Sequence, residues 1–486
     1  MTFLTIDIGS SSVRAILFDE HQNVIENSIV SRKYNFDVTA DGGSTVDANF
    51  LRGLVEACID EALTHPSAPT IRAVGMDTFV GNLMGVDRDG KPVTPIYTYA
   101  DSRSSEDVAL LSNAVEADSN LQRTGCPLHT AYHPARLHWL RRTQPDMFAA
   151  VKRWTDFGSF LYAAWFGQSA CSYSVTSWSG LLNRQSLTWD TEWLTRLGLD
   201  PTQFPPLADF TATQTGLTAA YAQRWSLLRD TPFFLAVGDG AVANVGTGAA
   251  SANTLAVTLG TTAAVRILCP SPDVVPPVPK GLWSYRLDRN HHLTGGATSE
   301  GGNTFQWLQT MFPSLDFERE QTAIMQRPAD SHGLTCLPLF NGERSPGWKS
   351  TAAATIHGLR LSTTPTDVFQ AALEGVAMRI ALIAEQLPSV PETIYVGGGA
   401  AMSSHVWVQM ICNVLDRPVH LVQVPETTAQ GVALILAFAL DQTPLGTYTP
   451  ITAFTFSPQP ENVSRMNAAR ERQQDLYHRL YDIDIT

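Results

Sequence analysis

Hydrophobic and polar positions follow the same order twice along this chain. Residues 3–18 read FLTIDIGSSSVRAILF, and residues 254–268 read TLAVTLGTTAAVRIL. Each segment predicts an apolar strand, a turn of Gly followed by Ser or Thr, and a second strand with an Arg near its start. A single copy is also typical of an ordinary hairpin with a hydroxyl-rich turn. Two copies at matching positions in the two halves favour duplicated lobes.

The pattern around the two copies predicts alternating strands and helices. In the first half we expect strands at 3–8, 13–19, 71–77 and 83–87, a helix at 47–64 and a largely helical stretch at 104–166. In the second half we expect a strand at 233–237, the repeated hairpin at 254–268, an irregular Pro-rich loop at 270–279, a helix from Pro365 to Leu387 and a strand at 393–396. The two predicted domains are residues 1–245 and 246–486.

The composition of the chain limits the kinds of partner that this protein can bind. The 486 residues are enough for two domains with substantial cores, and a net charge of −13 argues against nucleic acid, because no basic stripe can neutralise phosphates. The longest apolar run, 431–440, is too short to span a bilayer and predicts a buried helix. Six scattered cysteines without a CxxC pair, and a first strand with no leader before it, favour a cytosolic protein with reduced thiols. A homodimer is left open.

The two turns suggest phosphate chemistry. Backbone N–H groups and hydroxyls presented together suit a phosphate chain, so we expect a nucleoside triphosphate to be held between the lobes. The copies differ at one position, because Asp7 in the first is replaced by Thr258 in the second. A lone carboxylate beside a phosphate turn predicts a Mg²⁺ ligand at Asp7, although an Asp in a turn is also common.

Two further motifs carry a family resemblance. Residues 354–359 read ATIHGL and are followed, after seven residues, by D-V-x-x-A-A-L-E at 367–374; residues 132–140 read YHPARLHWL, with Arg136 where a Lys is usual. In this order and spacing, over nearly the full chain, the motifs resemble the FGGY carbohydrate kinases of the actin and hexokinase superfamily. The resemblance implies an α/β fold of two duplicated actin/hexokinase-like (ribonuclease H-like) lobes around a central cleft, the first mainly sugar-binding and the second mainly ATP-binding.

The same resemblance implies an ATP- and Mg²⁺-dependent kinase that phosphorylates a sugar hydroxyl. Asp239, between two glycines after a strand, matches the family's catalytic base and would also contact the substrate; by local sequence alone it is an ordinary helix cap. The residues that match the family's nucleotide positions are Ser10, Ser11, Ser12, Arg14, Gly260, Thr261, Thr262, Gly302, Asn303, Gly398, Gly399 and Ala400.

The sugar is the open part of the prediction. Much of the chain is similar to the gluconate kinase branch, for example GDGAVANVG at 238–246, but Val80-Gly81 and Ser299-Glu300 depart from it. A carboxylate at Glu300 would repel a sugar acid, which favours a neutral ketose or polyol as the alternative substrate. Arg344 is typical of the family, and we interpret it as structural. The candidate sugar contacts, each of which could instead be a satisfied structural group, are Thr78, Asn82, Asp101, Arg103, Tyr132 and His133.

Two other classes share these features. An actin-like or chaperone-like ATPase would have the twin turns but would hydrolyse ATP without sugar. A non-catalytic sugar sensor would be expected to lack Asp7 or Asp239, and both are present. The motif set therefore favours the kinase.

Overall fold

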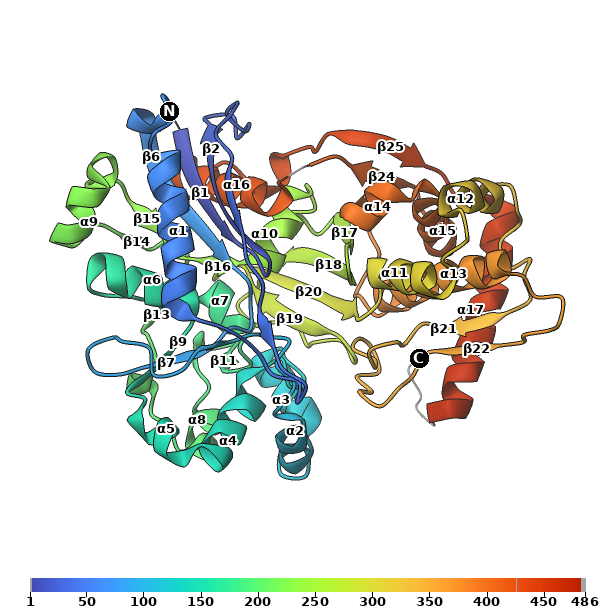
Figure 1. The fold of residues 1–486 in the computed structure, drawn as a ribbon, viewed down its shortest axis with the longest axis horizontal. Helices are drawn as coiled ribbons and strands as arrows, with labels where there is room; N and C mark the ends of the chain where they lie inside the picture. Colours follow the sequence, from blue (N-terminus) through green and yellow to red (C-terminus); the bar gives the residue numbers. More distant parts are fainter. Residues whose placement is uncertain (1, 425, 482–486) are drawn as a thin grey trace.

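The computed structural model describes residues 2–424 and 426–481 and contains two seven-stranded sheets with helices on their faces (Figure 1). The first sheet runs β14-β15-β6-β1-β2-β3, with β16 also paired to β6. Its strands are β1 (Thr2–Ile8), β2 (Ser12–Asp19), β3 (Val30–Lys33), β6 (Ile71–Thr78), β14 (Thr213–Gln214), β15 (Phe233–Phe234) and β16 (Val237–Gly238).

The second sheet runs β19-β20-β18-β17-β23-β24-β25. Its strands are β17 (Thr254–Leu259), β18 (Ala263–Pro270), β19 (Trp283–Arg286), β20 (His291–Thr298), β23 (Thr393–Gly397), β24 (Val419–Val422) and β25 (Thr452–Phe456). In both sheets the repeated hairpin has an antiparallel strand on one side, β3 or β20, and a parallel strand on the other, β6 or β23. The predicted α/β fold of two duplicated lobes is confirmed.

The helix α16 (Thr427–Asp441) comes from the second half of the chain but packs on the first sheet. Its apolar residues lie in one core cluster with Phe3 of β1 and Phe18 of β2. On the other face of the sheet, α1 (Ala48–Ala62) contributes Leu51 and Val55 to the core. Because helices cover both faces, every residue of β1 is buried. The buried helix expected at 431–440 is therefore part of α16.

The helices α10 (Asp239–Gly246) and α16 touch through glycines. A Cβ atom on Gly246 would lie 1.9 Å from the carbonyl oxygen of Thr427, and one on Gly431 would lie 1.9 Å from that of Val242. No side chain fits in either place, so the glycines let the two helices pack backbone to backbone. This contact fixes α10, which begins at Asp239, against both sheets.

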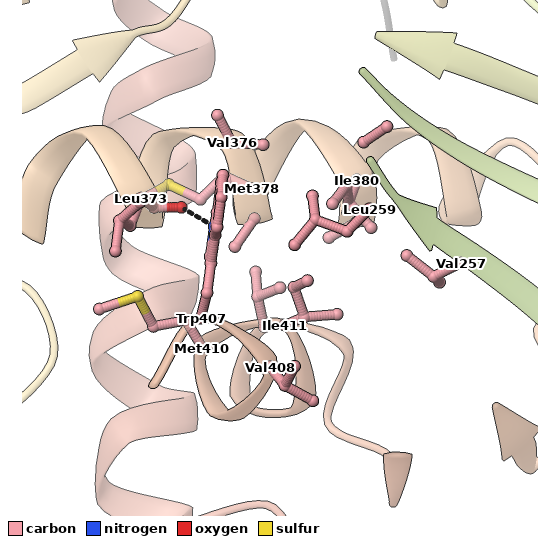
Figure 2. Packing of buried hydrophobic residues seen from close by; sticks show 14 of the residues in the cluster. Val257, Leu259, Leu373, Val376, Met378, Ile380, Trp407, Val408, Met410 and Ile411 are labelled. Carbon is pink, nitrogen blue, oxygen red and sulfur yellow. Dashed lines mark hydrogen bonds between the residues drawn. The ribbon is translucent and has the colours of Figure 1, made fainter. Parts of the chain in front are cut away.

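The core of the second lobe is built on α13 (Pro365–Glu385), which begins with a capping box between Thr364 and Asp367. The prediction of this helix is confirmed, with an end two residues before Leu387. Figure 2 shows its contact with α15 (His405–Leu415): the fully buried indole of Trp407 donates a hydrogen bond of 2.9 Å to the carbonyl of Leu373 and packs beside Met410 and Val376.

The expected helical stretch at 104–166 contains five helices and one short strand. The helices are α2 (Ser105–Ser112), α3 (Ala117–Thr124), α4 (His133–Thr143), α5 (Pro145–Ala150) and α6 (Phe157–Phe166). The strand β9 (Arg153–Thr155) pairs with β7 (Met84–Val86). Helices α2 to α5 gather below the first sheet in Figure 1, where they extend the first lobe.

The remaining elements are short or peripheral. They are β4 (Asp37–Val38), β5 (Ser44–Val46), β8 (Ile96–Tyr97), β10 (Cys171–Ser172), α7 (Tyr173–Ser177), β11 (Leu182–Asn183), β12 (Thr188–Trp189), α8 (Thr191–Leu197), β13 (Leu207–Ala208), α9 (Ala219–Arg224), α11 (Gly302–Met311), α12 (Phe317–Met325), β21 (Thr335–Leu337), β22 (Thr355–His357), α14 (Gly399–Ser403) and α17 (Pro460–Tyr481). Within the described residues, no helix has the length and apolar character needed to cross a membrane. The domain boundary at 245/246 stays a prediction, and residues 1 and 482–486 of the predicted domains lie outside the described residues.

Candidate active site

Three carboxylates meet where neighbouring parallel strands end. Asp7 on β1 lies opposite Asp77 on β6, and Val237 of β16 also pairs with Asp77. Asp239 follows β16 directly and is the first residue of α10. Asp7 is 3% exposed and Asp77 is fully buried. The carboxyl ends of three adjacent strands therefore bring Asp7, Asp77 and Asp239 together at one edge of the first sheet.

The first two of these carboxylates have very different surroundings. Arg14 donates a hydrogen bond of 2.8 Å to Asp7 and forms a second ion pair of 3.2 Å with Glu426, the residue before α16. Neither oxygen of Asp77 has a hydrogen-bond partner among the described residues. Burial, followed by the charges of Asp7 and Asp239, raises the pKa of Asp77 well above its usual range.

Asp239 has the character of a general base. Its side chain accepts a 2.7 Å hydrogen bond from the backbone N–H of Gly240. Burial raises its pKa to about 6, while the N–H groups of Gly240 and Val80 and the charge of Arg266 partly oppose the shift. A carboxyl group with this pKa is mostly ionised at neutral pH and is still basic enough to take a proton from an attacking hydroxyl.

An indole ring lies against the backbone around Asp239. A Cβ atom on Gly238 would lie 2.8 Å from Nε1 of Trp178, and one on Gly240 would lie 2.8 Å from its ring carbon Cη2. The Trp178 ring stacks on Tyr285, with centroids 3.7 Å apart. The two glycines that flank Asp239 are thus explained by close packing against Trp178. The sequence gives no signal for this tryptophan, because it reaches the site only through the fold.

Each predicted phosphate turn is closed by a hydrogen bond from its glycine, and the first turn is one residue longer than the second. The N–H of Gly9 donates to the carbonyl of Ser12 at 3.0 Å, and the N–H of Gly260 donates to the carbonyl of Thr262 at 3.0 Å. Ser11 is exposed and Ser10 is partly exposed, whereas Ser12 is buried. Thr261 and Thr262 are both exposed in the second turn. The hydroxyls at the tips of both turns are therefore free to meet a ligand.

A cavity of about 480 Å³ adjoins the second turn. It is lined by Gly260, Thr261, Gly302, Phe305, Gln306, Gln309, Gly399, Ala400, Ser403, Ser404 and Trp407. Five of these lining residues are predicted to bind the nucleotide, namely Gly260, Thr261, Gly302, Gly399 and Ala400. The cavity has the size of a small-molecule site, and its glycines expose bare backbone on one side.

Gly302 and two further predicted nucleotide residues, Asn303 and Gly398, hold the walls of this cavity. The N–H of Gly302 donates to the carbonyl of Gly260 at 2.6 Å. The side chain of Asn303 donates to Ser299 and accepts from the N–H of Gly301, so it fixes the turn before α11. Gly398 has a φ of 105°, and a Cβ atom there would lie 2.5 Å from the carbonyl of Leu259. Only glycine suits that position.

Several candidate sugar residues are already engaged with the protein. The amide oxygen of Asn82 accepts the N–H of Phe157 at 2.7 Å, and its nitrogen donates to the carbonyl of Phe79. Buried Thr78 lies opposite Gly238, and its hydroxyl accepts a weak 3.4 Å hydrogen bond from Asn82. These two residues shape the loop after β6 that approaches Asp239.

The other four candidates are Asp101, Arg103, Tyr132 and His133. Asp101 binds the Arg103 side chain at 3.1 Å, and the hydroxyl of Tyr132 bonds that of Tyr285 at 2.6 Å. Burial, followed by the charge of Arg136, lowers the pKa of His133 to about 3, so its ring is neutral. The role of the six candidate residues in sugar binding stays a prediction.

Arg136, in the N-terminal motif, is fully buried. Its guanidinium donates to the carbonyl oxygens of Gly81 at 2.9 Å, Thr98 at 2.6 Å and Thr130 at 3.1 Å. A guanidinium can hold these three carbonyls at once, so the Arg at this position joins the loop after β6 to two other segments.

The charge of Arg266, from the second lobe, acts on Asp239, and the charge of Arg344 acts on Arg266. Arg266 lies on the second strand of the repeat, as Arg14 does, but it pairs with Ala256, whereas Arg14 pairs with Asp7. Arg266 donates to the hydroxyl of Thr258 at 3.2 Å, and its Nε has no partner among the described residues. Burial lowers its pKa to about 10; the charge of Asp239 opposes this shift and that of Arg344 adds to it. Arg344 is partly exposed, and within 2–424 and 426–481 its side chain makes no recorded hydrogen bond or ion pair.

Sequence reasoning missed Asp77 and Arg266 as site residues, although both carry a signal. Asp77 stands near the end of an apolar strand as Asp7 does, and Arg266 is the Arg on the second strand of the repeated hairpin. Glu300 is 2% exposed, and its carboxylate accepts the N–H of Asn341 at 3.2 Å. Burial raises the pKa of Glu300 to about 7, which reduces its negative charge near neutral pH.

Comparison with known proteins agrees with this geometry. Residues 2–246 match the N-terminal domain of the FGGY family of carbohydrate kinases, and residues 255–440 match its C-terminal domain. A gluconokinase of Bacillus subtilis (strain 168) is 26% identical over 455 residues, which cover 90% of this chain and 87% of that protein. A xylulose kinase of Staphylococcus xylosus is 21% identical, with 89% of each chain covered.

Solved structures agree in fold. A gluconate kinase from Lactobacillus acidophilus superposes with a TM-score of 0.91 at 22% identity, over 99% of this chain and 98% of that one. Since both domain families match in order along most of its length, the chain belongs to the FGGY family of carbohydrate kinases, ATP-dependent enzymes that transfer a phosphoryl group to an alcohol.

Proposed function

We propose that this kinase phosphorylates a hydroxyl of gluconate or a closely similar sugar acid, with ATP and Mg²⁺. The observation that carries the kinase chemistry is the position of Asp239, which lies beside Asp7 and Asp77 and has a pKa raised to about 6. The sugar would bind mainly to the first lobe and ATP mainly to the second.

Asp239 accepts the proton of the attacking hydroxyl in this proposal. Its carboxylate is oriented by the N–H of Gly240. Transfer of a phosphoryl group demands little covalent work from the protein, so positioning and charge neutralisation supply most of the rate. Trp178 and the stacked Tyr285 would exclude water on one side.

The hydroxyl-bearing turns at 9–12 and 260–262 would hold the phosphate chain, with Arg14 beside the first. The cavity lined by Gly302, Gly399 and Ala400 would take the adenosine. A Mg²⁺ ion suits the donor set at Asp7, because carboxylate oxygens are its preferred protein ligands. When bound, the ion would neutralise charge on the β- and γ-phosphates.

An anionic substrate is favoured by two arginines: Arg266, whose charge acts on Asp239, and Arg344, whose charge acts on Arg266. Arg344 has no acidic partner within the described residues, and its charge acts on His129, Tyr132 and Arg266. Unpaired guanidinium groups beside a binding site suit a carboxylate, which they can bind through two parallel hydrogen bonds. The earlier interpretation of Arg344 as structural is replaced by this proposal. The gluconokinase relative supports the same substrate.

The test is a coupled ADP-release assay with gluconate, xylulose, ribulose, rhamnulose, fuculose, glycerol and erythritol. We expect turnover of gluconate, with kcat/KM reduced about tenfold to a hundredfold in Arg344→Gln, the range of a lost charged hydrogen bond of about 1.5–3 kcal/mol. The exposed Arg196 on α8 gives a matched control, Arg196→Gln, which should leave kcat/KM unchanged. Turnover of a neutral ketose with none of gluconate would overturn the sugar-acid proposal and leave the kinase intact.

A further inference from the structure

Asp77 is a buried carboxyl group for which the folded chain supplies no donor. It is fully buried, and neither of its oxygens has a hydrogen-bond partner among the described residues. Its neighbour across the β1–β6 ladder is another acid, Asp7. A buried carboxylate without a partner is costly, so this position needs a proton or a cation.

The cations nearby are committed to other groups. Arg14 binds Asp7 at 2.8 Å and Glu426 at 3.2 Å. Arg266 donates to Thr258 in the second lobe. None of the ion pairs recorded within the described part of the chain includes Asp77. The protein therefore places two acids side by side and provides a basic partner for only one of them.

The second lobe shows that the fold itself does not require this pair. In the repeat, Thr258 on β17 stands in the place of Asp7, and it lies opposite Gly397 on β23 just as Asp7 lies opposite Asp77 on β6. The duplicated strands thus adopt the same parallel register without either acid. The pair of carboxylates belongs only to the lobe whose strand end also meets Asp239.

We infer that Asp77 is a second carboxylate ligand for the divalent cation that accompanies ATP, together with Asp7. The inference rests on the proposed Mg²⁺-dependent kinase function. Two carboxylates at the ends of adjacent strands suit a hard divalent cation. The oxygens of Asp77 are buried and accept no hydrogen bond from the described residues, so we expect their partner to be a bound cation.

The experiment measures metal binding rather than turnover. Mn²⁺ is titrated into the full-length protein, alone and with a non-hydrolysable ATP analogue, and free Mn²⁺ is followed by electron paramagnetic resonance. We compare the wild type with Asp77→Asn, Asp7→Asn and a control, Glu461→Gln, which changes an exposed acid on α17. The Asp77→Asn variant should bind Mn²⁺ at least about tenfold more weakly, since even outer-shell partners of a metal contribute that much. The control should match the wild type.

Two results would overturn the inference: equal Mn²⁺ affinity in Asp77→Asn and wild type, or no Mn²⁺ binding by the wild type with the analogue present. The melting temperature of Asp77→Asn without metal should not fall, because the change removes a buried acid, whereas its stabilisation by Mn²⁺ should be lost. If Asp77→Asn does not fold, Asp77→Ser is measured in its place with the same expected result. Because no sugar is present, a wrong sugar assignment would leave these outcomes unchanged.

Discussion

Replacing Asp239 by Asn separates its two physical roles, the base and the partly buried charge. Asn keeps the shape of the side chain and can still accept the N–H of Gly240, but it cannot take a proton. A positioned general base contributes about 10²–10⁴-fold to a rate. We therefore expect kcat to fall by about that factor while the KM for ATP changes little.

The same variant should be more stable than the wild type. Burial raises the pKa of Asp239 from its ordinary 3.8 to about 6. Each pKa unit corresponds to about 1.4 kcal/mol, so the ionised side chain costs the fold up to about 3 kcal/mol. The cost is fully present above pH 6, and it disappears as the pH falls toward 3.8 because the carboxyl group becomes protonated in the folded state first.

Urea unfolding at pH 7.5 and pH 5.0 measures this difference. Asp239→Asn should exceed the wild type by up to about 3 kcal/mol at pH 7.5 and by about half as much at pH 5.0. The exposed Asp89 provides the control Asp89→Asn, which should show no such pH-dependent gain. A variant less stable than the wild type, or a gain independent of pH, would refute the reasoning from burial; near-normal turnover would remove Asp239 from the role of base.

Three other changes test the packing around the site. Gly431→Ala places a Cβ atom 1.9 Å from the carbonyl of Val242 and should lower the melting temperature by several degrees. The control Gly53→Ala on α1, whose Cβ atom meets no atom within 4 Å, should be neutral or stabilising. Equal melting temperatures of the two variants would contradict the close contact of α10 and α16. Arg136→Lys cannot hold three carbonyls and should cost about 1–3 kcal/mol in urea unfolding, and a smaller loss would show that the carbonyls find other donors. Gly399→Val projects into the cavity and should raise the KM for ATP about tenfold or more without loss of stability; an unchanged KM would place the nucleotide elsewhere.

Much of the fold could be predicted from the sequence because the informative elements are local. Each hairpin, at 3–19 and 254–268, has its strand pattern and its turn residues in one continuous segment. The capping box before Pro365 predicts the start of the helix that follows. Most of the Pro-rich loop predicted at 270–279 is confirmed, since 271–279 form neither helix nor strand, but its first residue, Pro270, is the last residue of β18. The six cysteines are all free and five are buried, as reduced thiols should be.

The parts that escaped prediction depend on contacts between distant segments. Trp178 lies 60 residues before Gly238 in the sequence and meets it only because α7 packs beside β16. The order of strands in the sheet likewise decides that Asp77, and no other acid, lies opposite Asp7. Arg344 was interpreted as structural from the sequence, and only the fold shows that no acid among residues 2–424 and 426–481 pairs with it.

The comparison of the two lobes explains where the specificity of this enzyme resides. Duplication supplies two equivalent turns, and both keep the closing hydrogen bond, from Gly9 to Ser12 and from Gly260 to Thr262. The first lobe differs from the second in its two acidic residues, Asp7 and Asp77, at the strand ends. The second lobe differs from the first in its cavity, which exposes bare backbone beside the turn. A metal and a nucleotide base require these different surroundings. In the proposed function, the first lobe would bind the cation and the sugar, the second would bind adenosine, and the phosphoryl group would be transferred between them beside Asp239.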